Sequence, residues 1–262
     1  QQLLADVTPT ATSISLNPSN GNFNVVNTLK LTQNELAIGR NAGLTTQGVN
    51  SVAIGFQAGQ TNQGAACVAI GNGVGNNNQG VNSVAIGTNT ASLAQGVNSV
   101  AIGLGAGNNT QGSSCVAIGV NAGVTTQGGN AVAIGLNAGR VTQQTDAVAI
   151  GNLAGLLTQG SNSVAVGVSA GENNQLSNAV AIGSNAGRGT TSGQGANSIA
   201  IGNNAGVASQ TAGSICLNAS GAALNPGQAG FFVNPIRGAA LGIGINRLSY
   251  DPVNFEIVYS TT

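Results

Sequence analysis

A sixteen-residue repeat constrains the fold of this chain more than any other feature of its sequence. The tetrapeptide Val-Ala-Ile-Gly, with close variants, recurs every sixteen residues and then once more after a spacing of nineteen. A twelfth, degenerate copy occupies residues 215–218. Repeats of this length are typical of solenoids, in which each repeat buries its apolar residues against its neighbours. The glycines that define the repeat are Gly39, Gly55, Gly71, Gly87, Gly103, Gly119, Gly135, Gly151, Gly167, Gly183 and Gly202.

Each repeat combines a short strand with turn residues. Val-Ala-Ile is a β-type run, and glycines at fixed offsets permit the backbone conformations of tight corners. Gln-Gly follows eight residues after most of the repeat glycines. Sixteen residues suffice for two short strands and two corners, so we expect about twelve coils that stack ~4.8 Å apart into a rod. The nineteen-residue spacing reflects three extra residues within 189–193, which should bulge from a corner.

The composition agrees with a stack of thin layers and excludes several partners. Only 5% of the residues are charged and 3% aromatic, so burial must come from many small side chains. The net charge is zero and the six Lys and Arg residues are scattered, which argues against nucleic acid as a partner. No apolar run reaches eighteen residues, and we therefore expect no membrane insertion.

The sequence lacks the residues of common catalytic and metal sites. It contains no His, which excludes a Ser-His-Asp or Cys-His arrangement and the commonest metal ligand. Asp251 and Glu256 are the only near neighbours that could act as paired carboxylates of a glycosidase. We interpret them as a turn Asp and a solvated strand Glu. The prediction is a protein without catalytic residues, cofactor or metal.

The Val-Ala-Ile strand has two different faces. Val and Ile point to one side, while the central Ala and the residue two positions before it point to the other. This second face is built of small residues, and one of the two faces must fill the coil while the other is covered by something else. We expect the small-residue face to meet another chain of a cyclic homo-oligomer. Its representative residues are Ala53, Ser83, Ser99, Cys67 and Cys115.

Two further features concern the corners and the cysteines. Glu172 and Arg188 occupy the same corner in successive coils and should form a surface ion pair.

Cys67 and Cys115 lie three coils apart, too far for a bridge within one chain. They are either packing residues or, as the alternative, partners of a bridge to a neighbouring chain.

The hexapeptide Asn50-Ser51-Val52-Ala53-Ile54-Gly55, which recurs at residues 82–87 and 98–103, resembles the head repeats of trimeric autotransporter adhesins. The resemblance covers about residues 36–218, although the coil is slightly longer than the usual adhesin repeat. It implies an all-β, left-handed parallel β-roll or β-solenoid that associates into homotrimers. It further implies an extracellular head at a cell surface, which contacts a host protein or glycan.

The ends do not follow the repeat. We expect residues 1–35 to form a β-rich cap or attachment segment and residues 36–218 the solenoid. Residues 219–262 should form a β-rich cap, a trimerisation module or a joint. Within this last segment, residues 231–237 and 250–259 resemble the ends of fibre proteins of large DNA viruses. This second resemblance points to a virion surface as the alternative location.

The expected function is mechanical and adhesive. A surface fibre of this kind would present repeated Asn, Gln and Thr corners to a host surface. One alternative is an extracellular filament that grows by end-to-end contacts. The other is an ice-binding solenoid, because one corner carries a polar column interrupted by Ala94; this single column is narrower than ice recognition needs, and we interpret it as a solvent-facing corner. Its residues are Thr46, Asn62, Asn78, Thr110, Thr126, Thr142, Thr158 and Asn174.

Overall fold

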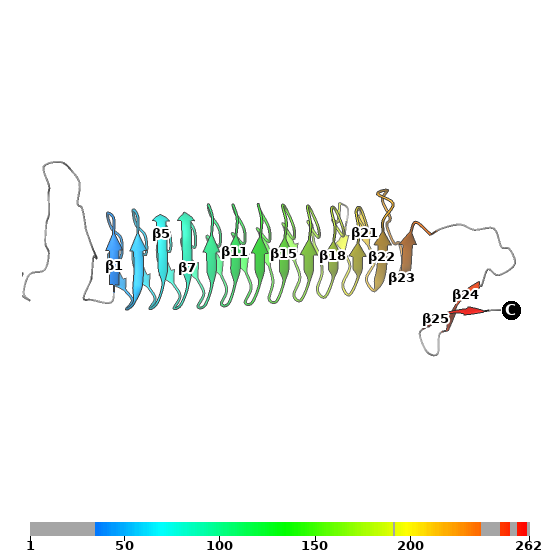
Figure 1. Ribbon diagram of the computed structural model, residues 1–262, viewed down its shortest axis with the longest axis horizontal. Helices are drawn as coiled ribbons and strands as arrows, with labels where there is room; N and C mark the ends of the chain where they lie inside the picture. The colour runs from blue at the N-terminus through cyan, green and yellow to red at the C-terminus, as the bar shows by residue number, and fades with distance from the viewer. Residues whose placement is uncertain (1–34, 191, 237–246, 252–255, 261–262) are drawn as a thin grey trace, which may run out of the picture. The chain divides into compact units, whose positions relative to one another are not determined.

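Short strands separated by glycine-containing corners coil into a parallel β-solenoid (Figure 1). The computed structural model describes residues 35–190, 192–236, 247–251 and 256–260. The chain divides into two units, residues 1–34 and residues 35–262. The first unit, and with it nearly all of the β-rich segment expected over residues 1–35, lies outside the described residues.

A 13-stranded parallel sheet, here called the long sheet, runs the length of the solenoid. Each strand except the last carries one Val-Ala-Ile copy or variant and pairs in register with its neighbours, sixteen residues away over most of the sheet. Thirteen strands at ~4.8 Å spacing span about 58 Å. In order, they are β1 (Glu35–Ile38), β3 (Ser51–Ile54), β5 (Val68–Asn72), β7 (Val84–Thr88), β9 (Val100–Ile102), β11 (Val116–Ile118), β13 (Val132–Ile134), β15 (Val148–Ile150), β17 (Val164–Val166), β18 (Val180–Ile182), β20 (Ile199–Ile201), β22 (Ser214–Asn218) and β23 (Gly230–Asn234).

The residues around the repeated Gln form a second parallel sheet of 8 strands, here called the short sheet. Its strands are β2 (Thr45–Gln47), β4 (Thr61–Gln63), β6 (Asn77–Gln79), β8 (Ala94–Gln95), β10 (Thr110–Gln111), β12 (Thr126–Gln127), β14 (Thr142–Gln143) and β16 (Thr158–Gln159). Isolated bridges through Gln175 carry the ladder on to β19 (Gly193–Gln194), which pairs with β21 (Ser209–Gln210). The regular short sheet ends at β16, one coil before the three-residue insertion, while β18 and β20 of the long sheet pair in register across the insertion.

The repeat glycines form the corner that follows each long-sheet strand. All of them have positive φ angles, from +106° at Gly202 to +140° at Gly87. A side chain would also collide there: a Cβ on Gly119 would lie 2.6 Å from the carbonyl oxygen of Gly135 in the next coil. Consecutive coils thus approach so closely at this corner that only glycine fits.

The interior of the coil is filled by alanine. The central Ala of every Val-Ala-Ile copy from β3 onward and the Ala of most Ala-Gly corners are fully buried and form one continuous cluster. The predicted all-β parallel solenoid of about twelve sixteen-residue coils is confirmed. The left-handed coil and the trimer that the resemblance implies stay predictions.

The chain beyond residue 218 adds one more strand to the long sheet. β23 pairs with β22 from Ser214↔Gly230 to Asn218↔Asn234, although it lacks the Ala-Ile-Gly motif. The start of the expected C-terminal module therefore continues the solenoid. Further on, β24 (Arg247–Asp251) and β25 (Glu256–Ser260) form an antiparallel pair.

Candidate functional site

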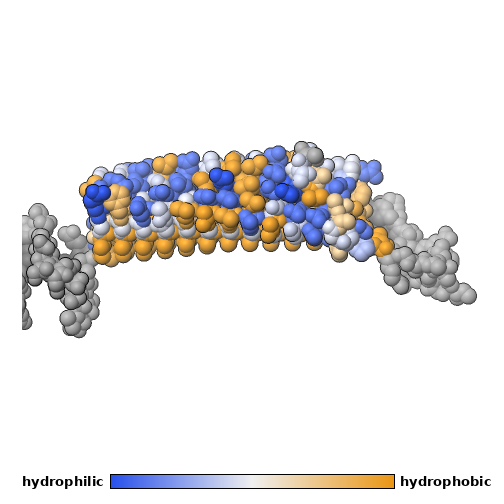
Figure 2. Space-filling model, turned by 90° about the horizontal axis from the view of Figure 1, so that it is seen from above, coloured by the Kyte–Doolittle hydropathy of each residue, from blue (hydrophilic) through white to orange (hydrophobic). Residues whose placement is uncertain are grey.

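The most prominent surface of the described chain is an apolar face on the outer side of the long sheet. Two columns of side chains make it up, and Figure 2 shows an unbroken hydrophobic band along the rod. The first column consists of Leu36, Val52, Val68, Val84, Val100, Val116, Val132, Val148, Val164, Val180, Ile199, Ile215 and Phe231. The second consists of Ile38, Ile54, Ile70, Ile86, Ile102, Ile118, Ile134, Ile150, Val166, Ile182, Ile201, Leu217 and Val233.

Strand alternation explains why these residues lie outside the coil. Successive side chains of a strand point to opposite faces, and Ala117, between Val116 and Ile118, is fully buried. The apolar residues remain in part accessible, up to 49% for Ile38 and 55% for Phe231. No polar residue interrupts either column over the thirteen strands.

The apolar face is as large as the largest apolar patches found on soluble monomers. At a length of about 58 Å and a width of about 10 Å it presents on the order of 600 Å². The largest apolar patch of a typical soluble monomer covers about 300 to 600 Å² and often has a function. A continuous apolar surface of this extent is suited to packing against another protein surface.

The small-residue face, by contrast, lies inside the coil, which reverses our expectation of an inter-chain surface. Ala53, Ser83, Ser99, Cys67 and Cys115 are each 0% exposed within the single chain. They therefore cannot contact a second chain. The sequence pattern separates the two faces of the strand correctly, but the assignment of inside and outside was wrong.

A ladder of buried glutamines explains this reversal. The Gln side chains of the short sheet reach across the interior to backbone carbonyls of the long sheet. Gln127 Nε2 donates to Val116 O at 2.9 Å, and Gln143 Nε2 donates to Val132 O at 2.8 Å. Because these amides fill the space between the sheets, only Ala-, Ser- or Cys-sized side chains fit opposite them.

The ladder also connects the coils to one another. Gln127 donates to Gln143 Oε1, and Gln143 in turn to Gln159 Oε1, both at 3.1 Å. Buried amides are stable only when they are hydrogen-bonded, which ties Gln127, Gln143 and Gln159 to one another. The buried Oε1 atoms of Gln63, Gln95 and Gln111 have no such partner in the described chain, so the side-chain ladder is interrupted at these coils. The regular Gln in each coil was the available sequence signal for the inner face, because a polar residue repeated at one position needs repeated partners.

The cysteines belong to the same interior. Cys67 Sγ donates to Gly80 O and Cys115 Sγ to Gly128 O, both at 2.9 Å. Burial raises the pKa of both thiols above the usual value. Full burial and a disfavoured thiolate exclude the inter-chain bridge that we considered as an alternative.

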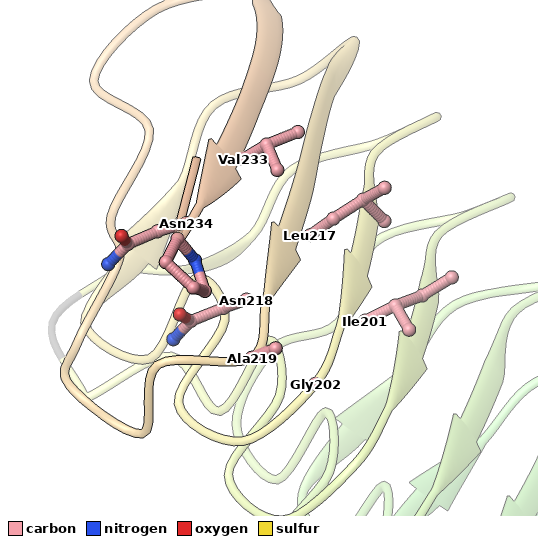
Figure 3. Close-up of a pocket in the computed structure, with 8 residues that line it drawn as sticks. Ile201, Gly202, Leu217, Asn218, Ala219, Val233 and Asn234 are labelled. Atoms are coloured by element: carbon pink, nitrogen blue, oxygen red, sulfur yellow. The ribbon is translucent and has the colours of Figure 1, made fainter. Parts of the chain in front are cut away.

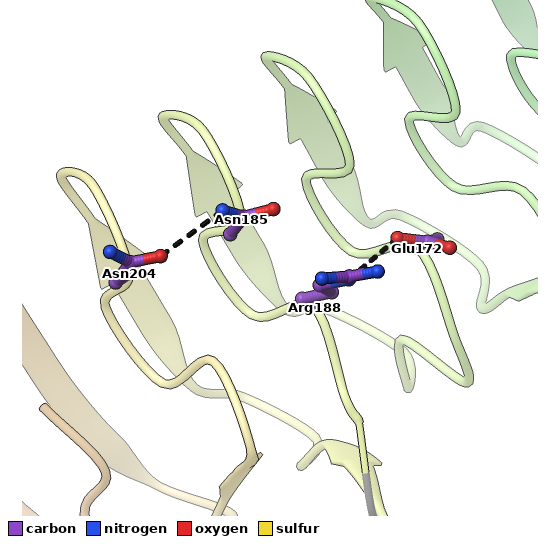
Figure 4. Close-up of polar contacts among 4 residues, drawn as sticks. All are labelled: Glu172, Asn185, Arg188 and Asn204. Atoms are coloured by element: carbon purple, nitrogen blue, oxygen red, sulfur yellow. Dashed lines mark hydrogen bonds and ion pairs between the residues drawn. The ribbon is translucent and has the colours of Figure 1, made fainter. Parts of the chain in front are cut away.

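The expected corner interactions are present on the polar surfaces. Arg188 Nε lies 2.8 Å from Glu172 Oε2, which confirms the predicted ion pair (Figure 4). A side-chain hydrogen bond of 3.1 Å from Asn185 Nδ2 to Asn204 Oδ1 likewise joins two neighbouring coils. These contacts are partly buried at the surface, and pairs near the surface contribute little to stability, ~0–1 kcal/mol.

The polar column considered for ice binding also stacks in register. Thr110, Thr126, Thr142 and Thr158 lie opposite one another in β10, β12, β14 and β16, and Ala94 precedes Thr110. Asn62 Nδ2 donates to Asn78 Oδ1 at 3.0 Å. At this rung the amides are engaged within the chain, consistent with a solvent-facing corner.

The remaining chemical candidates are the two carboxylates that we considered for a glycosidase. Asp251 and Glu256 are cross-strand partners at one end of the β24–β25 pair, and their side-chain geometry is not described. No group of three or more potential metal ligands occurs among the residues that the structure describes. Within those same residues, no helix has the length and apolar character needed to cross a membrane.

A shallow cavity of about 320 Å³ lies on the apolar face at the last three strands of the long sheet, β20, β22 and β23. Figure 3 shows Ile201, Leu217 and Val233 pointing to the same side of β20, β22 and β23. The rest of its lining consists of Gly202, Asn218, Ala219, Asn234 and Pro235. It contains no charged side chain, so the cavity is a local widening of the apolar face and not a separate chemical site.

Comparison with protein families identifies the repeat. The YadA head domain repeat matches residues 79–106 and residues 194–205, well under half of the chain. The first match lies in the regular part of the solenoid and the second contains the strand after the insertion. The search of curated proteins and that of solved structures gave no match.

The solenoid thus carries YadA head repeats, the repeats of a trimeric autotransporter adhesin head. YadA head domains are non-catalytic structural domains of cell-surface adhesins, and they are homotrimeric in that family. These repeats point to an adhesin-like surface fibre.

Proposed function

We propose that this chain, whose solenoid carries YadA head repeats, forms the rod or head of a homotrimeric surface fibre that contacts a host surface. The apolar face carries the proposal. It is continuous over thirteen strands, and a single chain leaves it in contact with water. Burial of this face between three parallel chains would remove on the order of 600 Å² per chain from water.

A trimer places the apolar faces around a common axis and directs the polar corners outward. The corners carry Asn and Thr side chains, such as the hydrogen-bonded pair Asn82 and Asn98. The repeated Gln, which we expected at these corners, is buried inside the coil and takes no part in this surface. In the proposed fibre these corners contact a protein or glycan of the host. The fibre stands on a cell surface or, following the resemblance of the chain's end, on a virion.

The segments outside the regular coils have supporting roles in this proposal. Residues 1–35 attach or cap the fibre, and residues 219–262 cap, trimerise or join it. Open solenoid ends present unpaired strand edges, so capping is needed to keep the fibre discrete. Without effective caps the same chain would grow end to end into a filament, which is the rival function.

Light scattering with matched variants tests the trimer. Ile118→Lys places a charge at the centre of the apolar face, whereas Thr126→Lys adds the same charge at an exposed position of the short sheet. We expect the wild type and Thr126→Lys to have three times the chain mass, and Ile118→Lys to be monomeric. A monomeric wild type contradicts the proposal, and growth to an indefinite mass favours the filament.

Host contact needs its own measurement. The labelled wild-type chain should bind to a subset of glycans or cell surfaces in an array, with the Ile118→Lys monomer binding more weakly because it loses multivalency. Equal binding of trimer and monomer would argue against the multivalent fibre. Absence of binding to every surface in the array would remove the adhesive part of the proposal.

A further inference from the structure

Three leucines of one coil interrupt the polar corner that joins each long-sheet strand to the short sheet. Leu153, Leu156 and Leu157 lie shortly after the repeat glycine Gly151. At the same three positions the other coils carry mainly polar residues or glycine, and no other coil is apolar at all three. We call this set of three residues the leucine corner.

Leu153 has a backbone conformation that disfavours a large side chain. Its φ is +61°, in the left-handed region, where Asn and Gly are common and bulky residues are rare. Most of the equivalent residues are Asn, such as Asn137 with a φ of +56°. Ala154 fills the interior of this corner, so packing of the core does not explain the leucine. Backbone strain of this kind gathers at functional sites.

The leucine corner is accessible from outside the coil. Leu157 is 40% exposed, and Leu153 and Leu156 are partly exposed. Backbone hydrogen bonds fix the corner within the stack: Val141 N donates to Leu156 O, and Leu157 N donates to Glu172 O, both at 3.0 Å. The three leucines belong to neither column of the apolar face. Association through that face therefore leaves them in contact with water.

A cation without an ion pair borders the leucine corner. Arg140 is exposed and occupies the position of Leu156 in the preceding coil, about 4.8 Å along the stack. In the following coil, Glu172 is already paired with Arg188 (Figure 4). Within the part of the chain that the structure describes, no carboxylate pairs with Arg140. One border of the leucine corner thus carries an uncompensated positive charge.

Aliphatic side chains beside one guanidinium define the chemistry of a matching partner. Arg is enriched at protein interfaces, and its planar guanidinium pairs with a carboxylate through two parallel hydrogen bonds. A protein segment that carries a carboxylate next to aliphatic side chains complements both parts of this surface. A glycan complements it less well, because leucines cannot pair with hydroxyl groups and unpaired polar groups at a contact cost free energy.

We propose that the leucine corner and Arg140 form a contact site for a host protein segment in which a carboxylate lies beside aliphatic side chains. The inference rests on the proposed surface fibre and names the class of partner at one of its corners. The carboxylate of the partner pairs with Arg140, and its aliphatic side chains pack on Leu156 and Leu157. A trimer carries three such sites, which strengthens attachment through multivalency.

Binding to a peptide array tests the chemistry of the partner. The array holds short synthetic peptides in which Glu alternates with Leu, and two matched sets in which Lys replaces Glu or Ser replaces Leu. We expect the labelled wild-type protein to bind the Glu–Leu peptides at least about tenfold more tightly than either matched set. Equal binding to the Glu and Lys sets, or no binding to the Glu–Leu set, overturns the proposal.

Matched variants locate the site on the chain. A triple variant with Leu153→Asn, Leu156→Gln and Leu157→Thr gives this coil the kinds of residue that other coils carry there. We expect it, and separately Arg140→Gln, to bind the Glu–Leu peptides at least about tenfold more weakly than the wild type. The control Leu93→Thr removes an isolated leucine, 47% exposed, from the same position of another coil and should bind like the wild type.

Thermal unfolding and light scattering of these variants separate a lost contact from a lost fold. Because Leu153→Asn relieves backbone strain, the triple variant should keep the thermal midpoint and the mass of the wild type. Arg140→Gln changes an exposed side chain and gives the same reading if the triple variant fails to fold.

The outcomes also distinguish this site from the proposed fibre. Unchanged peptide binding by the triple variant and by Arg140→Gln overturns the site. If the wild type is then still trimeric and binds cell surfaces, the proposed fibre stands. A monomeric wild type that binds neither peptides nor cell surfaces overturns both.

Discussion

At the scale of single residues, this solenoid depends on positions where the backbone of one coil meets that of the next. Gly119 has a φ of +127°, and the carbonyl group of Gly135 occupies the space that a side chain on it would need. Gln143 is fully buried and forms hydrogen bonds to the coils on either side. Both residues are fixed by the requirement that identical coils stack at ~4.8 Å.

Substitution of a repeat glycine should therefore destabilise the whole stack. In Gly119→Ala, the methyl group would lie 2.6 Å from Gly135 O in a backbone conformation that L residues rarely adopt. We expect the free energy of unfolding to fall by about 1–3 kcal/mol. Urea denaturation followed by circular dichroism measures this loss.

Gly227→Ala is the matched control, because no atom lies within 4 Å of the position that its new methyl group would take and its φ is not positive. It should unfold at the wild-type midpoint. Equal midpoints for Gly119→Ala and the wild type would show that the corner can relax, contrary to the close approach described here.

The sequence predicts the strands and the corner contacts well, because they follow from local chemistry. The Glu172–Arg188 pair follows directly from the sixteen-residue spacing. Which face of the strand lies inside does not follow from the Val-Ala-Ile triplet itself, because Val52 and Ile54 on one side and Ala53 on the other are all apolar. The buried Gln63 side chain determines which face lies inside, because it fills the interior and its amide donates to Val52 O at 3.0 Å. That contact depends on the tertiary structure.

At the scale of elements, each coil is a separate structural unit that contacts its two neighbours. β11 pairs with β9 and β13 only, and the corresponding short-sheet strand β12 pairs with β10 and β14. Stability in such an array is approximately a sum over coils and the interfaces between them. β23 shows that a strand without the repeat motif can still extend the array when it offers the correct ladder.

Deletion of one complete coil should therefore preserve the fold. Removal of residues 120–135 joins Gly119 to Leu136 and restores the repeat pattern. We expect a folded rod that is about 4.8 Å shorter, as measured by small-angle X-ray scattering. Removal of only residues 120–127 leaves half a coil and should yield a chain with reduced β-structure. The modular description fails if the two deletions have the same effect.

At the scale of the whole molecule, burial of the apolar face links folding to association. The interior of a single coil contains mainly Ala and Gln side chains, whereas the large aliphatic residues lie outside it. Much of the hydrophobic stabilisation available to this chain is therefore realised only when the apolar face is covered. We expect an isolated chain to be markedly less stable than the trimer.

The thermal midpoint of the wild type should consequently depend on protein concentration. Association of folded chains stabilises the native state by mass action, so Tm should rise over a roughly hundredfold increase in concentration. Ile118→Lys, as a monomer, should have a lower Tm that does not change with concentration. Thr126→Lys should follow the wild type. Differential scanning calorimetry of the three proteins measures this directly, and a concentration-independent Tm of the wild type would mean that the single coil stack is stable without its neighbours.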